Sequence, residues 1–226
     1  MKAICKKIPK TILFLGPSGS GKDTQIDLLA EKCGGKNIGT GDMFRTLYEE
    51  KVDGSVEAYE YVKKGIWVPD ELVYRLFSEW LKRFDREENW YFSQVVRTPE
   101  QVPLFDGLME SVGRTLDSVV HFALSKEAAV ERMSLRRVCP KCGRDFHLKF
   151  DKPKIDELCD DCGVKLETRD DDYPEAIMQR MEEYENKVKP VLDIYKKRGI
   201  LIEIDASPSI QEIHKTLLER LTGAKG

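Results

Sequence analysis

Residues 11–25 read TILFLGPSGSGKDTQ, and this stretch combines three local patterns in a fixed order. The apolar run TILFL is typical of a buried strand in a parallel sheet. Three glycines follow, and the next residues place apolar side chains at near-helical spacing until Gly34 and Gly35. A strand, a G-x-x-x-x-G-K loop and a helix, in this order, are the context of a P-loop.

The glycine loop is suited to binding phosphate groups. Glycines let successive backbone N–H groups point into one concavity, and the N-terminus of the following helix adds positive potential. Lys22 can reach outer phosphates as a point charge. An ordinary glycine-rich turn is the alternative, and the intact spacing in this context favours the phosphate site. The candidate phosphate-binding residues are Gly16, Gly19, Ser20, Gly21, Lys22, Asp23 and Thr24.

Further strand candidates alternate with helical patterns along the chain. They are WYFSQVV (90–96), SVVHFAL (118–124) and ILIEI (200–204). We expect helices after Pro99 and from near Ser125 and Ser207, two serines that can act as N-caps. The alternation predicts an α/β protein with a parallel sheet and right-handed crossovers. Residues 40–69, which look helical, and residues 138–168, which look like turns and short hairpins, are predicted to be insertions.

Composition and charge narrow the class of protein. The chain has 226 residues, 41% of them hydrophobic and 34% charged, with a formal net charge of −3. A general nucleic-acid or anionic-membrane binder usually carries a basic excess, so neither partner is expected. The sequence contains no apolar run of the ~20 residues that cross a bilayer and no signal-peptide pattern. We therefore expect a soluble, cytoplasmic protein.

Four of the six cysteines form two C-x-x-C pairs with the overall pattern C-x₂-C-x₁₆-C-x₂-C. The paired cysteines are Cys139, Cys142, Cys159 and Cys162. A glycine follows each pair, and four thiolates at this spacing favour a closed tetrahedral Zn²⁺ site. Two disulfides or an iron site are the alternatives. Cys5 and Cys33 remain, and we expect Cys33 to be a small buried apolar residue.

Six motifs resemble those of the adenylate kinases in order and spacing, over nearly the whole chain from about residue 11 to 221. They are GPSGSGKDTQ (16–25), GTGDMFR (39–45), GIWVPDELV (65–73), VVRTPEQ (95–101), VERMSLRR (130–137) and ETRDDD (167–172). The resemblance implies reversible transfer of the γ-phosphoryl group of ATP, bound with Mg²⁺, to AMP. The products are two molecules of ADP, and a monomer is expected.

The resemblance also implies a division of the chain. A P-loop core of three layers, α/β/α, would comprise residues 1–39, 70–137 and 169–226. Residues 40–69 would form an insertion that binds the nucleoside monophosphate, and residues 138–168 a zinc-stapled lid. About thirty residues cannot bury enough apolar surface to hold a shape alone, so metal ligation would stiffen the lid.

Functional residues follow from the resemblance, position by position. The implied catalytic residues are Lys22, Arg97, Arg136, Arg169 and Arg180. Arg132 and Arg136 would join the P-loop in binding ATP. AMP would be bound by Thr40, Gly41, Arg45, Val68, Arg97, Gln101, Arg169 and Arg180. Arginines suit phosphoryl transfer because they stay charged and bind phosphate oxygens bidentately while charge spreads over those oxygens.

Two positions depart from the family pattern. The family has D-G-F-P-R where this chain has SQVVR, so Ser93 replaces an aspartate that holds water around Mg²⁺, and Asp23 stands where glycine is usual. One hypothesis is that Asp23 takes over the orientation of the metal; the alternative is an aspartate of a first helical turn, facing solvent. Two other functions stay open: a kinase for another nucleoside monophosphate, and a nucleotide-binding protein with weakened catalysis.

Overall fold

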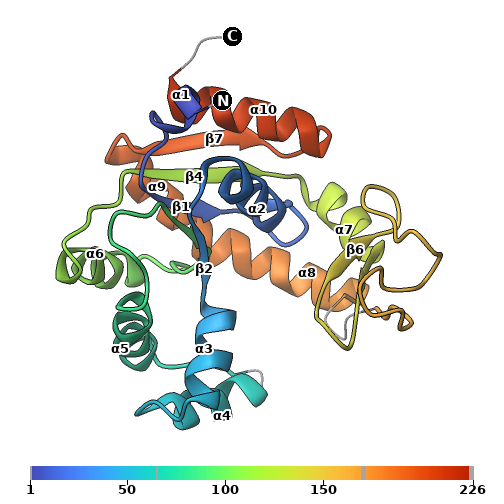
Figure 1. Ribbon diagram of the computed structural model, residues 1–226, viewed down its shortest axis with the longest axis horizontal. Coiled ribbons are helices and arrows are strands. Elements are labelled where there is room, and N and C mark those ends of the chain that lie inside the picture. Colours follow the sequence, from blue (N-terminus) through green and yellow to red (C-terminus); the bar gives the residue numbers. More distant parts are fainter. Residues whose placement is uncertain (1, 65, 169–171, 224–226) are drawn as a thin grey trace.

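The computed structural model describes residues 2–64, 66–168 and 172–223. Its centre is a five-stranded sheet in the order β2-β3-β1-β4-β7, and all neighbouring strands are parallel (Figure 1). The strands are β1 (Thr11–Leu15), β2 (Lys36–Gly39), β3 (Trp90–Ser93), β4 (Ser118–Ala123) and β7 (Leu201–Asp205). The predicted parallel α/β fold is confirmed.

Alternate residues of β1 pack into two different hydrophobic clusters, which explains why the strand is apolar throughout. Leu13 and Leu15 join one cluster, whereas Ile12 and Phe14 join the other. All five residues of the strand are buried. A strand covered by helices on both faces has no solvent-facing side for polar residues.

Helices cover both faces of the sheet and complete three layers. The cluster of Ile12 and Phe14 includes residues of α2 (Lys22–Cys33) and α10 (Ile210–Thr222). The cluster of Leu13 and Leu15 includes residues of α5 (Asp70–Leu81), α6 (Gln101–Ser111) and α9 (Lys189–Lys197). The remaining α-helices of the core are α1 (Lys2–Cys5), α7 (Lys126–Ser134) and α8 (Pro174–Glu183).

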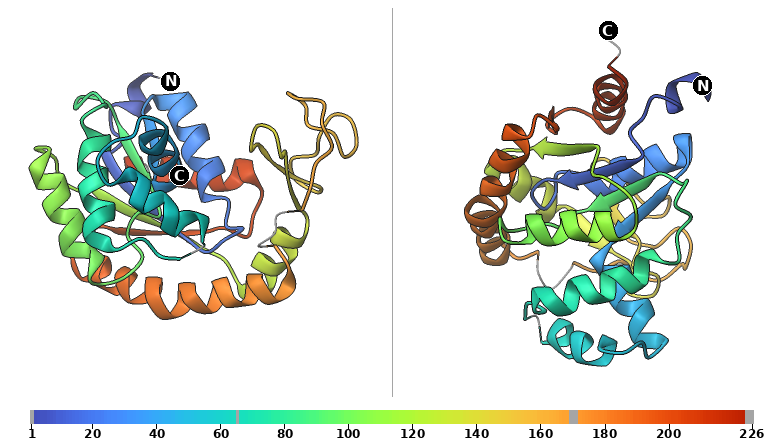
Figure 2. Two further views of the ribbon diagram at one scale, coloured as in Figure 1. Left: turned by 90° about the horizontal axis from the view of Figure 1, so that it is seen from below. Right: turned by 90° about the vertical axis from the view of Figure 1, so that its left-hand side faces the viewer.

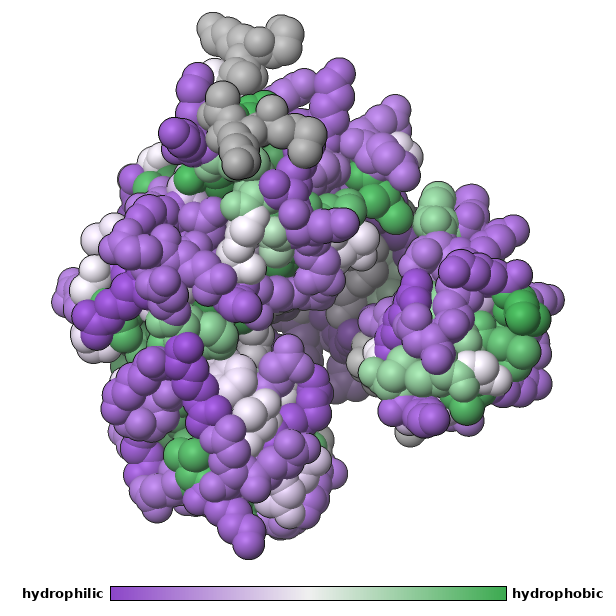
Figure 3. All heavy atoms as spheres, in the orientation of Figure 1, coloured by the Kyte–Doolittle hydropathy of each residue, from purple (hydrophilic) through white to green (hydrophobic). Residues whose placement is uncertain are grey.

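The two predicted insertions are the helical insertion (residues 40–69) and the cysteine finger (residues 138–168). The first contains α3 (Thr40–Glu49) and α4 (Ser55–Lys63). In the second, β6 (Asp145–His147) pairs antiparallel with β5 (Arg136–Val138), and Val138 also bridges to Glu167. Figure 3 shows the insertion and the finger as separate lobes with a hollow between them and the core.

The long helix that follows the cysteine finger changes its winding in the middle. Between α8 and α9 lies a π-helical turn, η1 (Tyr184–Val188), and the three segments form one long rod beside the sheet (Figure 2). The hydroxyl of Tyr184 lies 2.6 Å from Nε2 of His121 on β4, so this turn is fastened to the sheet. Single π-helical turns are frequent at functional sites.

Some local details differ from the predictions. The short strand β2, four residues long, was not anticipated because KNIG has no strand-like pattern. The predicted strand 90–96 ends at Ser93, since Gln94 has a φ of 49° and turns the chain away. Ser125 caps α7 as expected, but the cap of α10 is Ser209, in a capping box with Glu212.

The expectation that Cys33 is a small buried apolar residue is wrong, because Cys33 is only half-buried and forms a disulfide. Cys33 packs against a hydrophobic cluster, but its sulfur is bonded to that of Cys5 at 2.04 Å. The bond fastens the N-terminal segment to the end of α2. The sequence could not indicate it, because the two residues lie 28 positions apart and lack any motif.

Removing this disulfide should destabilise the folded state. For a loop of this length the cross-link lowers the entropy of the unfolded chain by an amount equivalent to about 3–4 kcal/mol. We expect the double variant Cys5→Ser/Cys33→Ser to unfold at a lower temperature than the oxidised protein, measured by circular dichroism. A phosphine reductant should lower the midpoint of the parent protein but not of the variant; equal sensitivity of both would contradict this role.

Candidate active site

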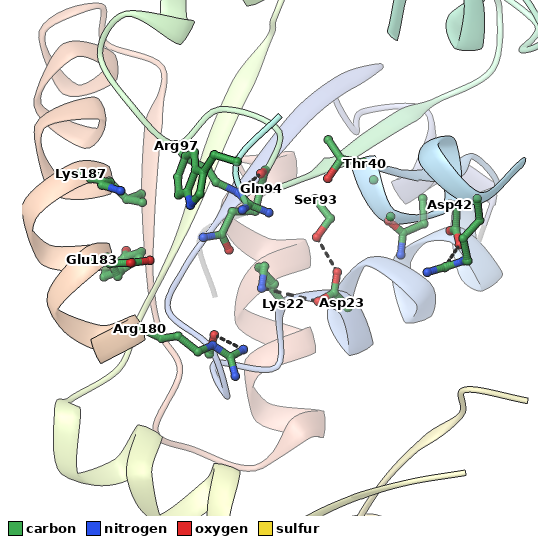
Figure 4. A pocket seen from close by; sticks show the side chains of 18 residues that line it. Lys22, Asp23, Thr40, Asp42, Ser93, Gln94, Arg97, Arg180, Glu183 and Lys187 are labelled. Carbon is green, nitrogen blue, oxygen red and sulfur yellow. Dashed lines mark hydrogen bonds and ion pairs between the residues drawn. The ribbon is translucent and has the colours of Figure 1, made fainter. Parts of the chain in front are cut away.

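A cavity of about 480 Å³ lies at the carboxyl ends of β1, β2 and β3, and we call it the central cleft (Figure 4). This edge of a parallel sheet is where open α/β folds bind ligands. Its charged lining comes from segments far apart in the sequence. These residues are Lys22, Asp23, Asp42, Arg45, Arg97, Arg180, Glu183 and Lys187.

The glycine loop has the backbone that the P-loop interpretation requires. Gly19 and Gly21 have φ values of 79° and 78°, which side chains with a Cβ rarely adopt. A Cβ on Gly19 would also lie 3.1 Å from Met133 and 3.3 Å from the carbonyl oxygen of Ala129. The buried Ser20 hydroxyl has no hydrogen-bond partner among the described residues.

Asp23 lines the central cleft. Its carboxylate accepts a hydrogen bond from the hydroxyl of Ser93 at 2.5 Å and lies 3.5 Å from the ammonium of Lys22 (Figure 4). Partial desolvation raises the pKa of Asp23, but the charge of Lys22 and the Ser93 hydrogen bond lower it more, so the net shift is downward. Asp23 is therefore held as a carboxylate beside the P-loop lysine.

Most of the predicted AMP-binding residues line the central cleft. Thr40, Gly41 and Arg45 line it from the start of α3, and Arg97 lines it from the segment after β3. Arg45 forms an ion pair with Asp42 of the same helix.

Two predicted AMP-binding residues are not among the residues that line the central cleft. Gln101 is buried; its side-chain oxygen accepts the backbone N–H of Arg97 at 2.7 Å and its amide donates to Asp70 at 2.7 Å. Gln101 thus fixes the backbone of Arg97. Val68 packs, half-buried, against the hydrophobic cluster of the core.

A buried carboxylate joins two of the predicted catalytic arginines. Asp172, whose side chain is fully buried, accepts two hydrogen bonds from Arg136 at 2.6 and 2.7 Å and one from Arg180 at 3.3 Å. Arg180 also donates to the Ser18 hydroxyl of the glycine loop at 2.7 Å. Arg169 lies outside the described residues. Asp172 was part of a recognised motif, but its role as a shared partner was not predicted.

Arg132 lies where the cysteine finger meets the core. Its guanidinium donates to the carbonyl oxygens of Ser207 at 3.1 Å and Gly19 at 3.5 Å. The ring of Phe150, from the finger, lies 5.6 Å from Cζ of Arg132. Phe150 is 47% exposed, so it offers an apolar surface near the P-loop that sequence reasoning missed.

Trp67 is a second aromatic residue that sequence reasoning missed. Its ring lies 4.2 Å from the Lys187 ammonium on η1 and 5.6 Å from Cζ of Arg97. A tryptophan face attracts cations by its quadrupole, so these contacts connect the helical insertion to the core. The signal in the sequence was an aromatic residue inside the motif GIWVPDELV.

The four predicted metal ligands come together in the finger. The Sγ atoms of Cys139, Cys142, Cys159 and Cys162 all lie within 4.8 Å of one another, and the four cysteines are free thiols. The alternative of two disulfides is therefore wrong.

The two halves of the finger repeat one turn. The N–H of Gly143 donates to the carbonyl oxygen of Cys139 at 2.9 Å, and that of Gly163 to the carbonyl oxygen of Cys159 at 2.8 Å. Burial raises the pKa of the Cys139 thiol, but hydrogen bonds from the backbone of Cys142 and Lys141 lower it to about 7. Four sulfur ligands, one favoured as a thiolate, fit a closed structural Zn²⁺ site that leaves no ligand position for chemistry.

Loss of one ligand should release the metal and loosen only the finger. We expect the parent protein to contain about one Zn²⁺ per chain and Cys142→Ser to lose it. Hydrogen exchange should accelerate in residues 138–168 and stay unchanged in β1 and β4, because the core has its own apolar clusters. Zinc-free parent protein prepared without chelator, or equal exchange of the finger in both proteins, would contradict the prediction.

The fold and the central cleft together define a P-loop protein that handles nucleotide phosphates. The chain belongs to the adenylate kinase family: the family model for adenylate kinase matches residues 14–200. An adenylate kinase of Caldanaerobacter subterraneus subsp. tengcongensis is 36% identical over 212 residues, which are 94% of this chain and 96% of the relative.

Two further adenylate kinases are similar to this chain over most of their length. An adenylate kinase of Archaeoglobus fulgidus is 35% identical over 91% of this chain and 95% of its own length. One of Thermotoga neapolitana is 38% identical over 92% of this chain and 95% of its own length. The chain is an enzyme of this family, whose reaction converts ATP and AMP into two ADP. None of the helices in the described part of the chain is long and apolar enough to cross a membrane.

Proposed function

We propose that this enzyme carries out phosphoryl transfer in the central cleft, with the donor phosphates on the P-loop and AMP on the side of α3. The observation that carries the proposal is the convergence of Lys22, Arg97 and Arg180 on one cavity from three separate segments of the chain. Positively charged groups that surround a transferring phosphoryl group stabilise the charge of its transition state.

Each side chain has a proposed role that follows from its position. Lys22 and the backbone N–H groups of residues 18–24 hold the β- and γ-phosphates of ATP, with Mg²⁺ countering their charge. Arg45 and Arg97 hold the phosphate of AMP, and Thr40 and Gly41 border its nucleoside. Arg180, which reaches Ser18 of the loop, lies between donor and acceptor.

The cysteine finger is proposed to act as the lid. Arg132 and Arg136 precede it and Arg169 follows it, so a rigid finger that moves about its ends would deliver cations to the phosphates and exclude water. Arg132 and Phe150 offer a cation and an aromatic face beside the P-loop, a pair suited to the base of ATP. The division into core (1–39, 70–137, 169–226), helical insertion (40–69) and lid (138–168) is part of this proposal.

The acceptor preference is the part that an experiment must decide. Single-turnover transfer from ATP should be fastest to AMP among AMP, dAMP, CMP, UMP and GMP. Faster transfer to another monophosphate would favour the alternative of a different nucleoside monophosphate kinase. ATP binding without transfer to any acceptor would favour a nucleotide-binding protein whose catalysis is weakened by the sequence SQVVR.

We also propose a cytoplasmic location and the lack of nucleic-acid or membrane partners, from composition and charge, and a monomeric state, from the family resemblance. The Cys5–Cys33 disulfide weighs against a strongly reducing compartment, because disulfides are rare there. Sedimentation of the purified enzyme and the oxidation state of Cys5 in freshly lysed cells would test these points.

A further inference from the structure

We propose that Asp23 and Ser93 together orient the Mg²⁺ that accompanies the donor nucleotide, with the carboxylate on the P-loop and the hydroxyl on the end of β3. The proposal rests on the proposed donor site and specifies how the metal is held there.

The two side chains form a single unit at the central cleft. Asp23 belongs to the first turn of α2, and Ser93 is the last residue of the neighbouring strand β3. They are joined by a hydrogen bond of 2.5 Å although 70 positions separate them, and both line the central cleft. An aspartate that only favoured a helix start would need no partner on another element.

Their chemistry matches what P-loop proteins need at these two places. Those proteins hold Mg²⁺ with a Ser or Thr hydroxyl directly after the P-loop lysine and with an aspartate from a nearby strand. Here the residue after Lys22 is the carboxylate of Asp23 and the strand residue is the hydroxyl of Ser93. Both a hydroxyl and a carboxylate are therefore present, but the carboxylate follows the P-loop lysine and the hydroxyl lies on the strand. Both offer the oxygen ligands that Mg²⁺ prefers.

Charge gives a second reason. In the structure the negative charge of Asp23 is countered by Lys22, 3.5 Å away. When Lys22 contacts donor phosphates, Asp23 faces a polyanion, and this contact is repulsive unless a cation lies between them. A divalent cation shared by the carboxylate and the phosphates converts repulsion into attraction. Removal of the Asp23 charge should therefore strengthen the binding of metal-free nucleotide and weaken the binding of metal-bound nucleotide.

The test measures binding of a non-hydrolysable ATP analogue by calorimetry, with EDTA and across a Mg²⁺ titration. For Asp23→Asn we expect binding in EDTA to tighten by about twofold or more, whereas the Mg²⁺ concentration for half-maximal binding rises about tenfold. The exchange variant Asp23→Ser/Ser93→Asp should return the Mg²⁺ requirement to within about threefold of the parent protein.

Asp27→Asn is the matched control. Asp27 carries the same charge one turn further along α2, accepts a hydrogen bond from Asn37 at 3.0 Å and does not line the central cleft. Its Mg²⁺ requirement should stay that of the parent. Mn²⁺ paramagnetic resonance with the analogue bound gives an independent readout, because altered oxygen ligation in Asp23→Asn should change the spectrum.

The outcomes separate this proposal from the proposed function. If the parent protein binds no ATP analogue, the donor site itself is wrong. If the parent binds it and Asp23→Asn shows the same or a lower Mg²⁺ requirement and an unchanged Mn²⁺ spectrum, Asp23 is only a residue of a helix start. If Asp27→Asn shifts the Mg²⁺ requirement as much as Asp23→Asn, the effect is general electrostatics and the proposal fails.

Discussion

Arg97→Ala should lower kcat/KM for AMP by about 100- to 1,000-fold, the cost of removing one preorganised donor from a charged transition state. Arg97 lines the central cleft, and its backbone N–H is fixed by Gln101. Its guanidinium donates to the carbonyl oxygen of Gln94 at 3.2 Å and faces Trp67. The side chain is thus positioned before AMP arrives. Steady-state kinetics with AMP varied at saturating ATP measure the effect.

Arg198→Ala is the control for this prediction. Arg198 forms a bidentate ion pair with Asp106 at 2.7 and 3.0 Å, and it lies outside the residues that line the cleft. Its removal should leave kcat/KM close to that of the parent protein. Binding of ATP to Arg97→Ala should survive, because the P-loop is intact. An unchanged kcat/KM for Arg97→Ala would mean that the acceptor phosphate binds elsewhere.

Asp172→Ala should destabilise the protein by about 3–5 kcal/mol, because it removes the buried partner of two arginines. The carboxylate is fully buried and receives hydrogen bonds from both Arg136 and Arg180. Without it, two guanidinium groups at the base of the proposed lid repel each other in a partly desolvated site. Urea unfolding followed by circular dichroism measures the loss.

Asp106→Ala is the control, because it removes one partner of a surface ion pair. Its partner Arg198 is 39% exposed, and such surface pairs contribute about 0–1 kcal/mol. If Asp106→Ala and Asp172→Ala lower the free energy of unfolding equally, the burial of Asp172 does not increase its contribution to stability. Asp172→Asn should retain part of the hydrogen bonding and fall between the two.

The core and the metal ligands could be predicted because their signals are local. The strand–glycine–helix pattern of residues 11–33 requires only neighbouring residues, and two C-x-x-C pairs determine four ligands without knowledge of the fold. Helix starts are nearly as local, although the cap at Ser209 was placed at Ser207, two positions early, since both serines precede the same apolar pattern.

Features that depend on long-range contacts could not be predicted from the sequence. The partnership of Asp172 with Arg136 and Arg180, and the contact of Trp67 with Lys187, join segments whose proximity depends on the folded core. Gln101 illustrates the converse: a motif assigns it to AMP, whereas its side chain is occupied by the Arg97 backbone and Asp70. A motif identifies the position, and the surrounding contacts determine what the side chain can still reach.

The bond between Cys5 and Cys33 also has a topological consequence. It closes a covalent ring that contains β1, the whole glycine loop and the whole of α2. A protease that cuts once inside this ring leaves the two pieces attached, so the nicked enzyme keeps its mass apart from one added water. Only reduction would then release the N-terminal fragment. The phosphate-binding loop of the oxidised enzyme is thus part of a macrocycle, which a single break opens without dividing the molecule.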